Sequence, residues 1–141
     1  FGHDIWSEDH VLEAGLGFAV KENKAQSKFG GMIGADAVMA KRNDGLSQRL
    51  MQFRLTDPDP LLYHNEAIYR DGAVIGYLTS GNYGHYLGGA IGLGYVKCNS
   101  IGETAESQLN AHYQIDVAGK LVDAEVSLRP LYDPKALQVK L

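Results

Sequence analysis

Short runs of alternating apolar residues, separated by turn-forming dipeptides, constrain the fold of this chain more than any other feature. Residues 51–55 alternate between apolar and polar side chains, which is typical of a strand with one buried face. Asp71-Gly72 separates the apolar runs 67–70 and 73–79. Asp-Gly at such a place is a strong hairpin signal, because the two-residue turn needs positive φ. These patterns predict antiparallel β-structure.

The same kind of pattern continues to the end of the chain. It predicts a loop at 80–84, a glycine-diluted strand at 89–96, an irregular stretch at 102–107, and strands at 112–117 and 121–128 around a turn at 118–120. The glycines of 89–96 stand in the reverse order of a dinucleotide-binding fingerprint, so we expect them to allow close backbone packing. Together the patterns predict a mainly β fold, a small antiparallel Greek-key β-barrel of about six strands.

The first third of the chain lacks this alternation and predicts a short α-helical or irregular segment before the barrel. Residues 7–9 are expected to cap a short helix that ends near Gly15. A second helix is expected at 35–42, because an acidic residue lies in its first turn, basic residues lie in its last turn, and Gly45 follows. All eight tyrosines come after residue 50, so composition changes where the barrel is expected to begin.

Composition excludes several classes of protein. The 141 residues carry 17 acidic and 13 basic side chains, a net charge of −4, whereas nucleic-acid binding requires a basic surface. No apolar run approaches the roughly 18 residues of a membrane span. The single cysteine, Cys98, cannot form an internal disulfide. We expect no nucleic-acid or membrane partner, and a cytoplasmic protein, or one of the mitochondrial matrix in a eukaryote.

Residue patterns alone assign no catalytic residue and no metal ligand. His3, Asp4, Asp9 and His10 could be drawn as a metal cluster, but nothing places them on one helix face. No Ser-His-Asp order and no G-x-S-x-G elbow is present. Patterns alone therefore predict a folded β-rich chain without assignable chemistry.

Aromatic residues before the barrel leave two interpretations open. Trp6, Phe18 and Phe29 lie in a segment with little strand pattern. They could hold a flat ligand by ring contacts within apolar walls, or they could pack in a core. The first residue, Phe1, is not methionine, so we expect a piece of a longer chain.

Several longer segments of the sequence resemble one protein family. These are FGHDI at 1–5, EAGLGFAVK at 13–21, IGADAV at 33–38, YLTSGNYGHYLGGAIGLGYV at 77–96 and RPLYDP at 129–134. In this order they resemble the C-terminal region of the aminomethyltransferase, or glycine cleavage T-protein, superfamily. The segments PLLYHNEAIYRDG and SGNYGHYLG are most similar to the T-protein-like half of dimethylglycine and sarcosine dehydrogenases.

The resemblance implies two parts of a larger enzyme. Residues 1–48 would be the tail of a folate-binding aminomethyltransferase domain, and residues 49–141 the C-terminal β-barrel domain. Tetrahydrofolate would capture a one-carbon unit as methylenetetrahydrofolate, and in the dehydrogenases an upstream FAD domain would oxidise an N-methyl amine. The expected partners are a folate and the upstream domains of the same parent chain. The 141 residues alone would be inactive and would supply only part of the tetrahydrofolate site.

The resemblance also implies three residues of the folate site. Phe18 takes a place where T-proteins often have tryptophan, and that aromatic is similar to one lining the folate pocket. Phe1 stands at the position before GHDI where the family has an aromatic residue. Glu13 belongs to the same segment as Phe18, EAGLGFAVK. The family's catalytic aspartate and its upstream folate-binding residues have no counterpart here. The alternative is a non-catalytic barrel that serves packing or partner contact.

Overall fold

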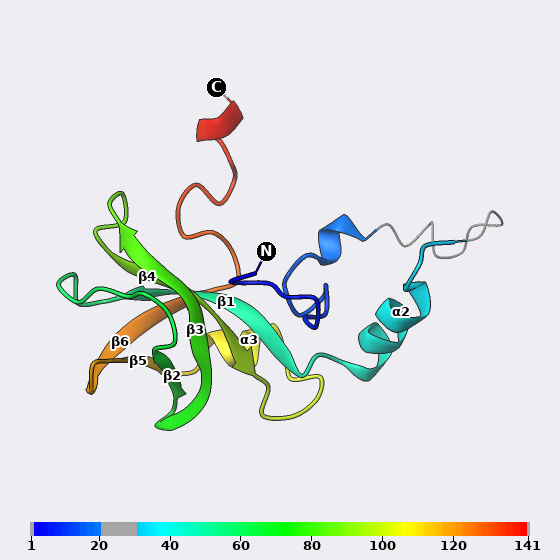
Figure 1. Cartoon of the computed structure of the whole chain (residues 1–141), viewed down its shortest axis with the longest axis horizontal. Coiled ribbons are helices and arrows are strands. Elements are labelled where there is room, and N and C mark those ends of the chain that lie inside the picture. Colours follow the sequence, from blue (N-terminus) through cyan, green and yellow to red (C-terminus); the bar gives the residue numbers. More distant parts are fainter. Residues whose placement is uncertain (1, 21–30, 141) are drawn as a thin grey trace.

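Six antiparallel strands form the body of the protein. The computed structural model describes residues 2–20 and 31–140. The strands are β1 (Gln48–Leu55), β2 (Ala67–Arg70), β3 (Ala73–Gly84), β4 (Gly89–Lys97), β5 (Tyr113–Val117) and β6 (Lys120–Ser127). They close into a barrel in the order β1-β4-β3-β2-β5-β6 (Figure 1). The meander of β2, β3 and β4, with β1 beside β4, is a Greek key, so the predicted fold class is confirmed.

Helical structure is sparse and lies outside the barrel wall. The elements are η1 (Gly17–Ala19), α2 (Ala35–Asp44), α3 (Ala105–Leu109) and η2 (Gln138–Lys140). α2 stands beside the barrel, and the chain after β6 leaves the barrel as an arm (Figure 1). We call residues 2–20 the N-terminal segment and residues 128–140 the C-terminal arm. No helix among the described residues has the length and apolar character needed to cross a membrane.

Two tight hairpin turns confirm the turn signals in the sequence. Asp71 and Gly72 have φ of 51° and 84° between β2 and β3. Ala118 and Gly119 have φ of 53° and 86° between β5 and β6. Positive φ at both central residues is the geometry that matches the twist of paired strands. The predicted helix over 35–42 is confirmed as α2.

Apolar side chains that alternate along the strands fill the barrel. The core consists of Met51, Phe53, Leu55, Leu62, Ile68, Leu78, Ala90, Val96, Tyr113, Ile115 and Val122. The rings of Phe53 and Tyr113 meet edge to face, with centroids 5.6 Å apart, an arrangement that the ring quadrupoles favour. The core leaves the alternate side chains of β1, β3 and β4 on the outer wall, where they can meet a ligand.

Three local predictions were wrong. Residues 80–84 are not a loop but the end of β3, since Gly84 pairs with Gly89 across a turn at 85–88. Residues 7–15 form turns rather than a helix, because Asp9 accepts a hydrogen bond from the Trp6 amide, on its N-terminal side. The stretch 102–107 contains the start of α3, where Thr104 Oγ1 accepts from the Ser107 amide as an N-cap.

Candidate functional site

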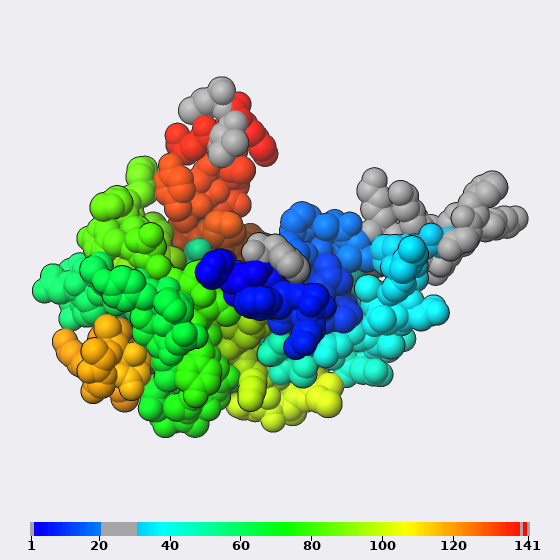
Figure 2. All heavy atoms as spheres, in the orientation of Figure 1, coloured from blue at the N-terminus to red at the C-terminus, as the bar shows by residue number. Residues whose placement is uncertain are grey.

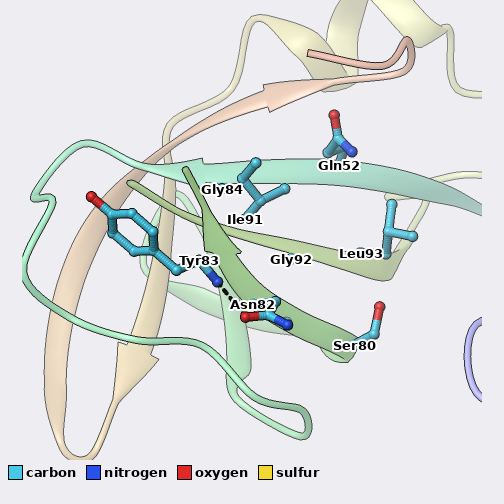
Figure 3. Close-up of a pocket in the computed structure, with 9 residues that line it drawn as sticks. Gln52, Ser80, Asn82, Tyr83, Gly84, Ile91, Gly92 and Leu93 are labelled. Carbon is cyan, nitrogen blue, oxygen red and sulfur yellow. Dashed lines mark hydrogen bonds between the residues drawn. The ribbon is translucent and has the colours of Figure 1, made fainter. Parts of the chain in front are cut away.

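The outer wall of the barrel carries a pocket of about 360 Å³. It is lined by Gln52, Ser80, Gly81, Asn82, Tyr83, Gly84, Ile91, Gly92 and Leu93. These residues come from β1, β3 and β4, and Figure 3 shows Gln52, Ser80 and Leu93 around it. The wrongly predicted loop at 80–84 is therefore a strand that forms one side of this pocket.

A second hollow, of about 300 Å³, adjoins the first and shares Gln52 and Leu93 with it. Its other lining residues are Ala14, Gly15, Leu50, Met51, Ser127, Leu128, Arg129 and Pro130. The surface is hollowed between the C-terminal arm and the N-terminal segment (Figure 2). We call the two adjoining hollows the outer groove. The N-terminal segment, the barrel and the arm all contribute to it.

A β-bulge fastens the N-terminal segment beside the outer groove. Leu78 pairs with Gly94 and Ser80 with Leu93, which leaves Thr79 as the extra residue. Successive strand residues normally point to opposite faces, but the bulge brings two hydroxyls to one side. Thr79 Oγ1 and Ser80 Oγ both donate to Asp4 Oδ1, at 2.6 and 2.7 Å. Asp4 is therefore an anchor of the N-terminal segment.

Glu13 is a second anchor and is buried, with 5% of the residue exposed. Its Oε1 accepts from the Ser47 amide at 2.9 Å and the Ser47 hydroxyl at 2.7 Å, and it pairs with Lys41 Nζ at 2.7 Å. Burial alone would raise the pKa of Glu13, but the bonds from Lys41 and Ser47 outweigh it and hold the pKa at about 2. The backbone oxygen of Glu13 accepts from the Leu50 amide on β1.

This network predicts a pH-dependent effect of Glu13→Gln. We expect the free energy of unfolding to fall by about 1–2 kcal/mol at pH 7, because the charge-assisted bond to Lys41 is lost. Since the folded-state pKa lies below its ordinary value of 4.5, the wild type loses this stabilisation as pH falls from 4.5 towards 2. The variant should lose less over that interval. Urea denaturation at pH 7 and pH 3 measures both values.

The exposed Glu8 provides the control for this experiment. Glu8→Gln removes one carboxylate from the same segment and is expected to change stability by less than about 0.5 kcal/mol. Equal stability of the Glu13→Gln variant and the wild type at pH 7 would show that the anchor contributes nothing.

The structure describes two of the three predicted folate-site residues. Phe18 lies in η1 with 86% of its surface exposed, so it is not a core residue. The Glu13 carboxylate accepts a hydrogen bond from Ser47 and forms an ion pair with Lys41. Phe1 and Phe29 lie outside the described residues. Contact of Phe1, Phe18 or Glu13 with a folate stays a prediction.

A larger open hollow, of about 640 Å³, lies between η1 and the end of α2. It is lined by Leu12, Gly17, Lys41, Arg42, Asn43, Asp44, Gly45, Leu46, Arg49 and Gly102. Lys41 is paired with Glu13, and Arg49 Nη1 donates to Gln108 Oε1 at 2.7 Å. These two cations serve internal contacts, so we place the candidate site in the outer groove.

Within residues 2–20 and 31–140, no group of three or more His, Cys, Asp or Glu side chains could hold a metal ion. Burial raises the pKa of the Cys98 thiol. A thiol with a raised pKa is a poor nucleophile at neutral pH. Cys98 is therefore not a candidate nucleophile.

A solved structure shares this architecture. The aminomethyltransferase T of the glycine cleavage system from Bartonella henselae aligns with a TM-score of 0.70 over 89% of this chain and 32% of that chain, at 22% identity. This likeness shows a shared fold, which in this chain is built on a closed antiparallel barrel. Residues 48–133 match the glycine cleavage T-protein C-terminal barrel domain. The chain belongs to this family, as the resembling sequence segments indicated.

Two relatives extend the similarity over nearly the whole chain. 4-Methylaminobutanoate oxidase (formaldehyde-forming) of Paenarthrobacter nicotinovorans is 34% identical over 99% of this chain and 16% of its own length. Mitochondrial sarcosine dehydrogenase of Mus musculus is 30% identical over 97% of this chain and 14% of its own length. The chain thus spans about a sixth or less of the length of these two relatives.

Sequence reasoning missed several residues of the outer groove. Gln52 could have been found, because it alternates with buried Met51 and Phe53 and must face outward. The sequence pattern predicts a loop at Asn82. Arg129 stands out only as part of RPLYDP, a segment that carries the family resemblance. The position of Asp4, which lies outside the lining of the groove, could not have been predicted either, since a bulge brings its partners Thr79 and Ser80 together.

Proposed function

We propose that the chain is the C-terminal part of a folate-dependent one-carbon enzyme and that the outer groove is one wall of its tetrahydrofolate site. Family membership and the relatives support this assignment. The observation that carries it is the composition of the groove. Gly15, Gln52 and Arg129 come from the N-terminal segment, the barrel and the arm, and the similarity to the relatives runs through all three.

The proposal divides the chain into residues 1–48, the tail of the folate-binding domain, and residues 49–141, the barrel domain. α2 supports this division, because none of its residues is buried and Ile33 just before it is fully exposed. A helix of ten residues is marginal in water by itself. We therefore propose that α2 packs against upstream domains of the same parent chain, one of which holds FAD if the parent is a dehydrogenase.

In this proposal the chain binds and orients, and the parent supplies the reacting groups. Bound tetrahydrofolate would supply a nucleophilic nitrogen that takes up an electrophilic one-carbon unit. The apolar side chains of Leu93 and Ile91 in the groove offer contacts to a flat ligand. The exposed ring of Phe18 lines neither hollow and is proposed to contact a part of the ligand that extends beyond the groove. Holding the ligand in one orientation is what accelerates a step between two bound groups. The 141 residues alone are expected to be inactive.

Phe18→Ala tests the proposal in the full-length parent protein. Aromatic contacts contribute about 0.5–1.5 kcal/mol, so we expect the Kd for tetrahydrofolate to rise about two- to tenfold. Thermal stability should not change, because the ring is exposed. Isothermal titration calorimetry under anaerobic conditions measures the affinity.

Tyr77→Ala serves as the matched control, since Tyr77 is also an exposed aromatic but lies on β3, outside the N-terminal segment for which the resemblance implies folate contact. Tyr77→Ala should leave the affinity for tetrahydrofolate unchanged. Absence of tetrahydrofolate binding to the wild-type full-length protein would overturn the proposed function. Binding that Phe18→Ala leaves unaltered would remove Phe18 from the site.

The second candidate is a barrel that serves only packing or partner contact. The exposed apolar side chains of the arm, including Tyr132 and Leu137, favour contact with other polypeptide. A purely structural barrel predicts that variants in the outer groove alter stability or assembly and leave folate affinity intact. A cytoplasmic location, or the mitochondrial matrix in a eukaryote, stays part of the proposal.

A further inference from the structure

A small pocket of about 270 Å³ lies between the start of the N-terminal segment, β3 and the stretch of chain before β2. Its lining includes Gly2, His3, Trp6, His64, Asn65 and Tyr77, and we call it the aromatic pocket. It shares no lining residue with the outer groove. The start of the N-terminal segment lies beside β3 (Figure 2), so this pocket is a separate feature of the barrel wall.

Hydrogen bonds fix both walls of the aromatic pocket. The Trp6 amide donates to Asp9 Oδ2 at 2.8 Å, and the Asp9 amide donates to the Trp6 carbonyl oxygen at 3.2 Å. On the other wall, the Asn65 amide donates to the Leu78 carbonyl oxygen at 2.8 Å. A site whose backbone is already ordered loses little conformational entropy when a partner fills it. The pocket is therefore preformed.

Two large aromatic side chains of the pocket are exposed. Trp6 and Tyr77 are 58% and 59% exposed, and neither ring packs against another aromatic ring among the described residues. None of the described residues that line the pocket is Asp, Glu, Lys or Arg. Aromatic side chains combined with a depletion of charged groups are typical of the centre of an interface between polypeptides.

The size and position of the pocket indicate what fills it. Sites for small-molecule ligands usually have about 300–1,000 Å³, so a pocket of about 270 Å³ suits a side chain better than a whole ligand. Gly2 lines the pocket, so in a longer parent the chain that precedes it passes the rim. Each residue advances a chain by at most about 3.6 Å, and such a short tether gives a contact a high effective concentration.

We propose that the aromatic pocket receives an apolar side chain from the stretch of the parent chain directly before residue 1. The contact covers Trp6 and packs the upstream part of the parent against the wall at β3. Two observations support a parent whose longer part lies upstream: the chain spans 16% and 14% of two relatives, and it matches a C-terminal barrel domain. The longer parent is part of the proposed function, on which this inference rests.

Thiol labelling of the full-length parent protein tests the contact. His64→Cys places a thiol at an exposed position of the pocket and keeps the Trp6 ring. We expect N-ethylmaleimide to modify this thiol about tenfold or more slowly than an exposed one, because modification requires the upstream stretch to detach. Leu121→Cys is the matched control, since Leu121 is 44% exposed and lies on β6, which does not pair with β3. Mass spectrometry of the labelled peptides measures both rates.

A change at Trp6 checks the cause of the protection. Trp6→Ala in the His64→Cys protein should raise the labelling rate towards that of Leu121→Cys, because the contact loses its largest ring, whereas Trp6→Phe should keep most of the protection. Equal labelling rates of His64→Cys and Leu121→Cys would overturn the inference. So would protection that disappears on dilution, since a second copy would then cover the pocket. Tetrahydrofolate binding is measured separately, and its absence would overturn the proposed function while the labelling rates decide the contact.

Discussion

Replacing Arg70 by Met is expected to lower the free energy of unfolding by about 3–5 kcal/mol at pH 7. Arg70 and Glu103 form an ion pair whose side chains are only 5% and 7% exposed. Two guanidinium nitrogens donate to the two oxygens of Glu103. Removal of Arg70 leaves a carboxylate that is buried and has lost its counter-charge, which is the costly case for a buried pair.

The pH dependence of this effect follows from Glu103. Hydrogen bonding from Arg70, supported by bonds from the Asn99 amide and the Ser107 hydroxyl, outweighs burial and lowers the pKa of Glu103 from 4.5 to about 2. The wild type therefore keeps this stabilisation above pH 4.5 and loses it as pH falls towards 2. The difference in stability between wild type and Arg70→Met should shrink over that interval. Denaturation curves at pH 7 and pH 3 test the sign.

Two further variants separate charge burial from other causes. Arg70→Met combined with Glu103→Leu should recover part of the loss, because the unpaired buried charge is gone. Arg54→Met breaks an exposed pair with Glu125 and should cost less than about 1 kcal/mol. Equal destabilisation by Arg70→Met and Arg54→Met would contradict the assignment.

The hairpins of the barrel could be predicted because their determinants are local. Asp71-Gly72 and Ala118-Gly119 adopt the positive φ that their turn requires, and the flanking runs alternate with the pleat. The helix at 35–44 carries its charges in the order that its dipole favours. In each case a few neighbouring residues determine the structure.

Predictions failed for two reasons: strand pairing with residues distant in sequence, and a local side-chain hydrogen bond that competes with the predicted element. Residues 80–84 have the glycine, serine and asparagine of a loop, yet they pair with residues 89–93 as the end of β3. Residues 7–9 have the composition of a helix cap, but the Asp9 carboxylate closes a turn on Trp6 instead. Cross-strand pairing decided the first case and is not visible in a single segment, whereas a competing local hydrogen bond decided the second.

The candidate site, too, could be predicted from the sequence only in part. Family resemblance supplied Phe18 and Glu13, and the structure places one on the surface and the other in an internal ion pair. The groove itself depends on residues 30 to 77 positions apart that only the closed barrel brings together, such as Gln52, Asn82 and Arg129. A sequence pattern reports outward-facing side chains but not which of them share a surface.

Replacing Gly94 by Ala is expected to lower the free energy of unfolding by about 3 kcal/mol, the upper end of the cost of overpacking. A methyl group on Gly94 would lie 2.7 Å from the carbonyl oxygen of Tyr77 and 3.1 Å from the Cα of Leu78. Both atoms belong to the backbone of β3, the neighbouring strand. The strand pair would have to separate to make room, and the barrel closes through that pair.

Gly89→Ala is the matched control on the same strand. There a methyl group would lie 3.2 Å from its nearest neighbour, the Leu55 oxygen, so a small shift accommodates it and we expect a loss below about 1 kcal/mol. Urea denaturation followed by tyrosine fluorescence compares the two variants. Equal stability of both would mean that the glycines of β4 are not needed for strand packing. A larger loss for Gly94→Ala explains the glycine-rich sequence by barrel closure, without a nucleotide.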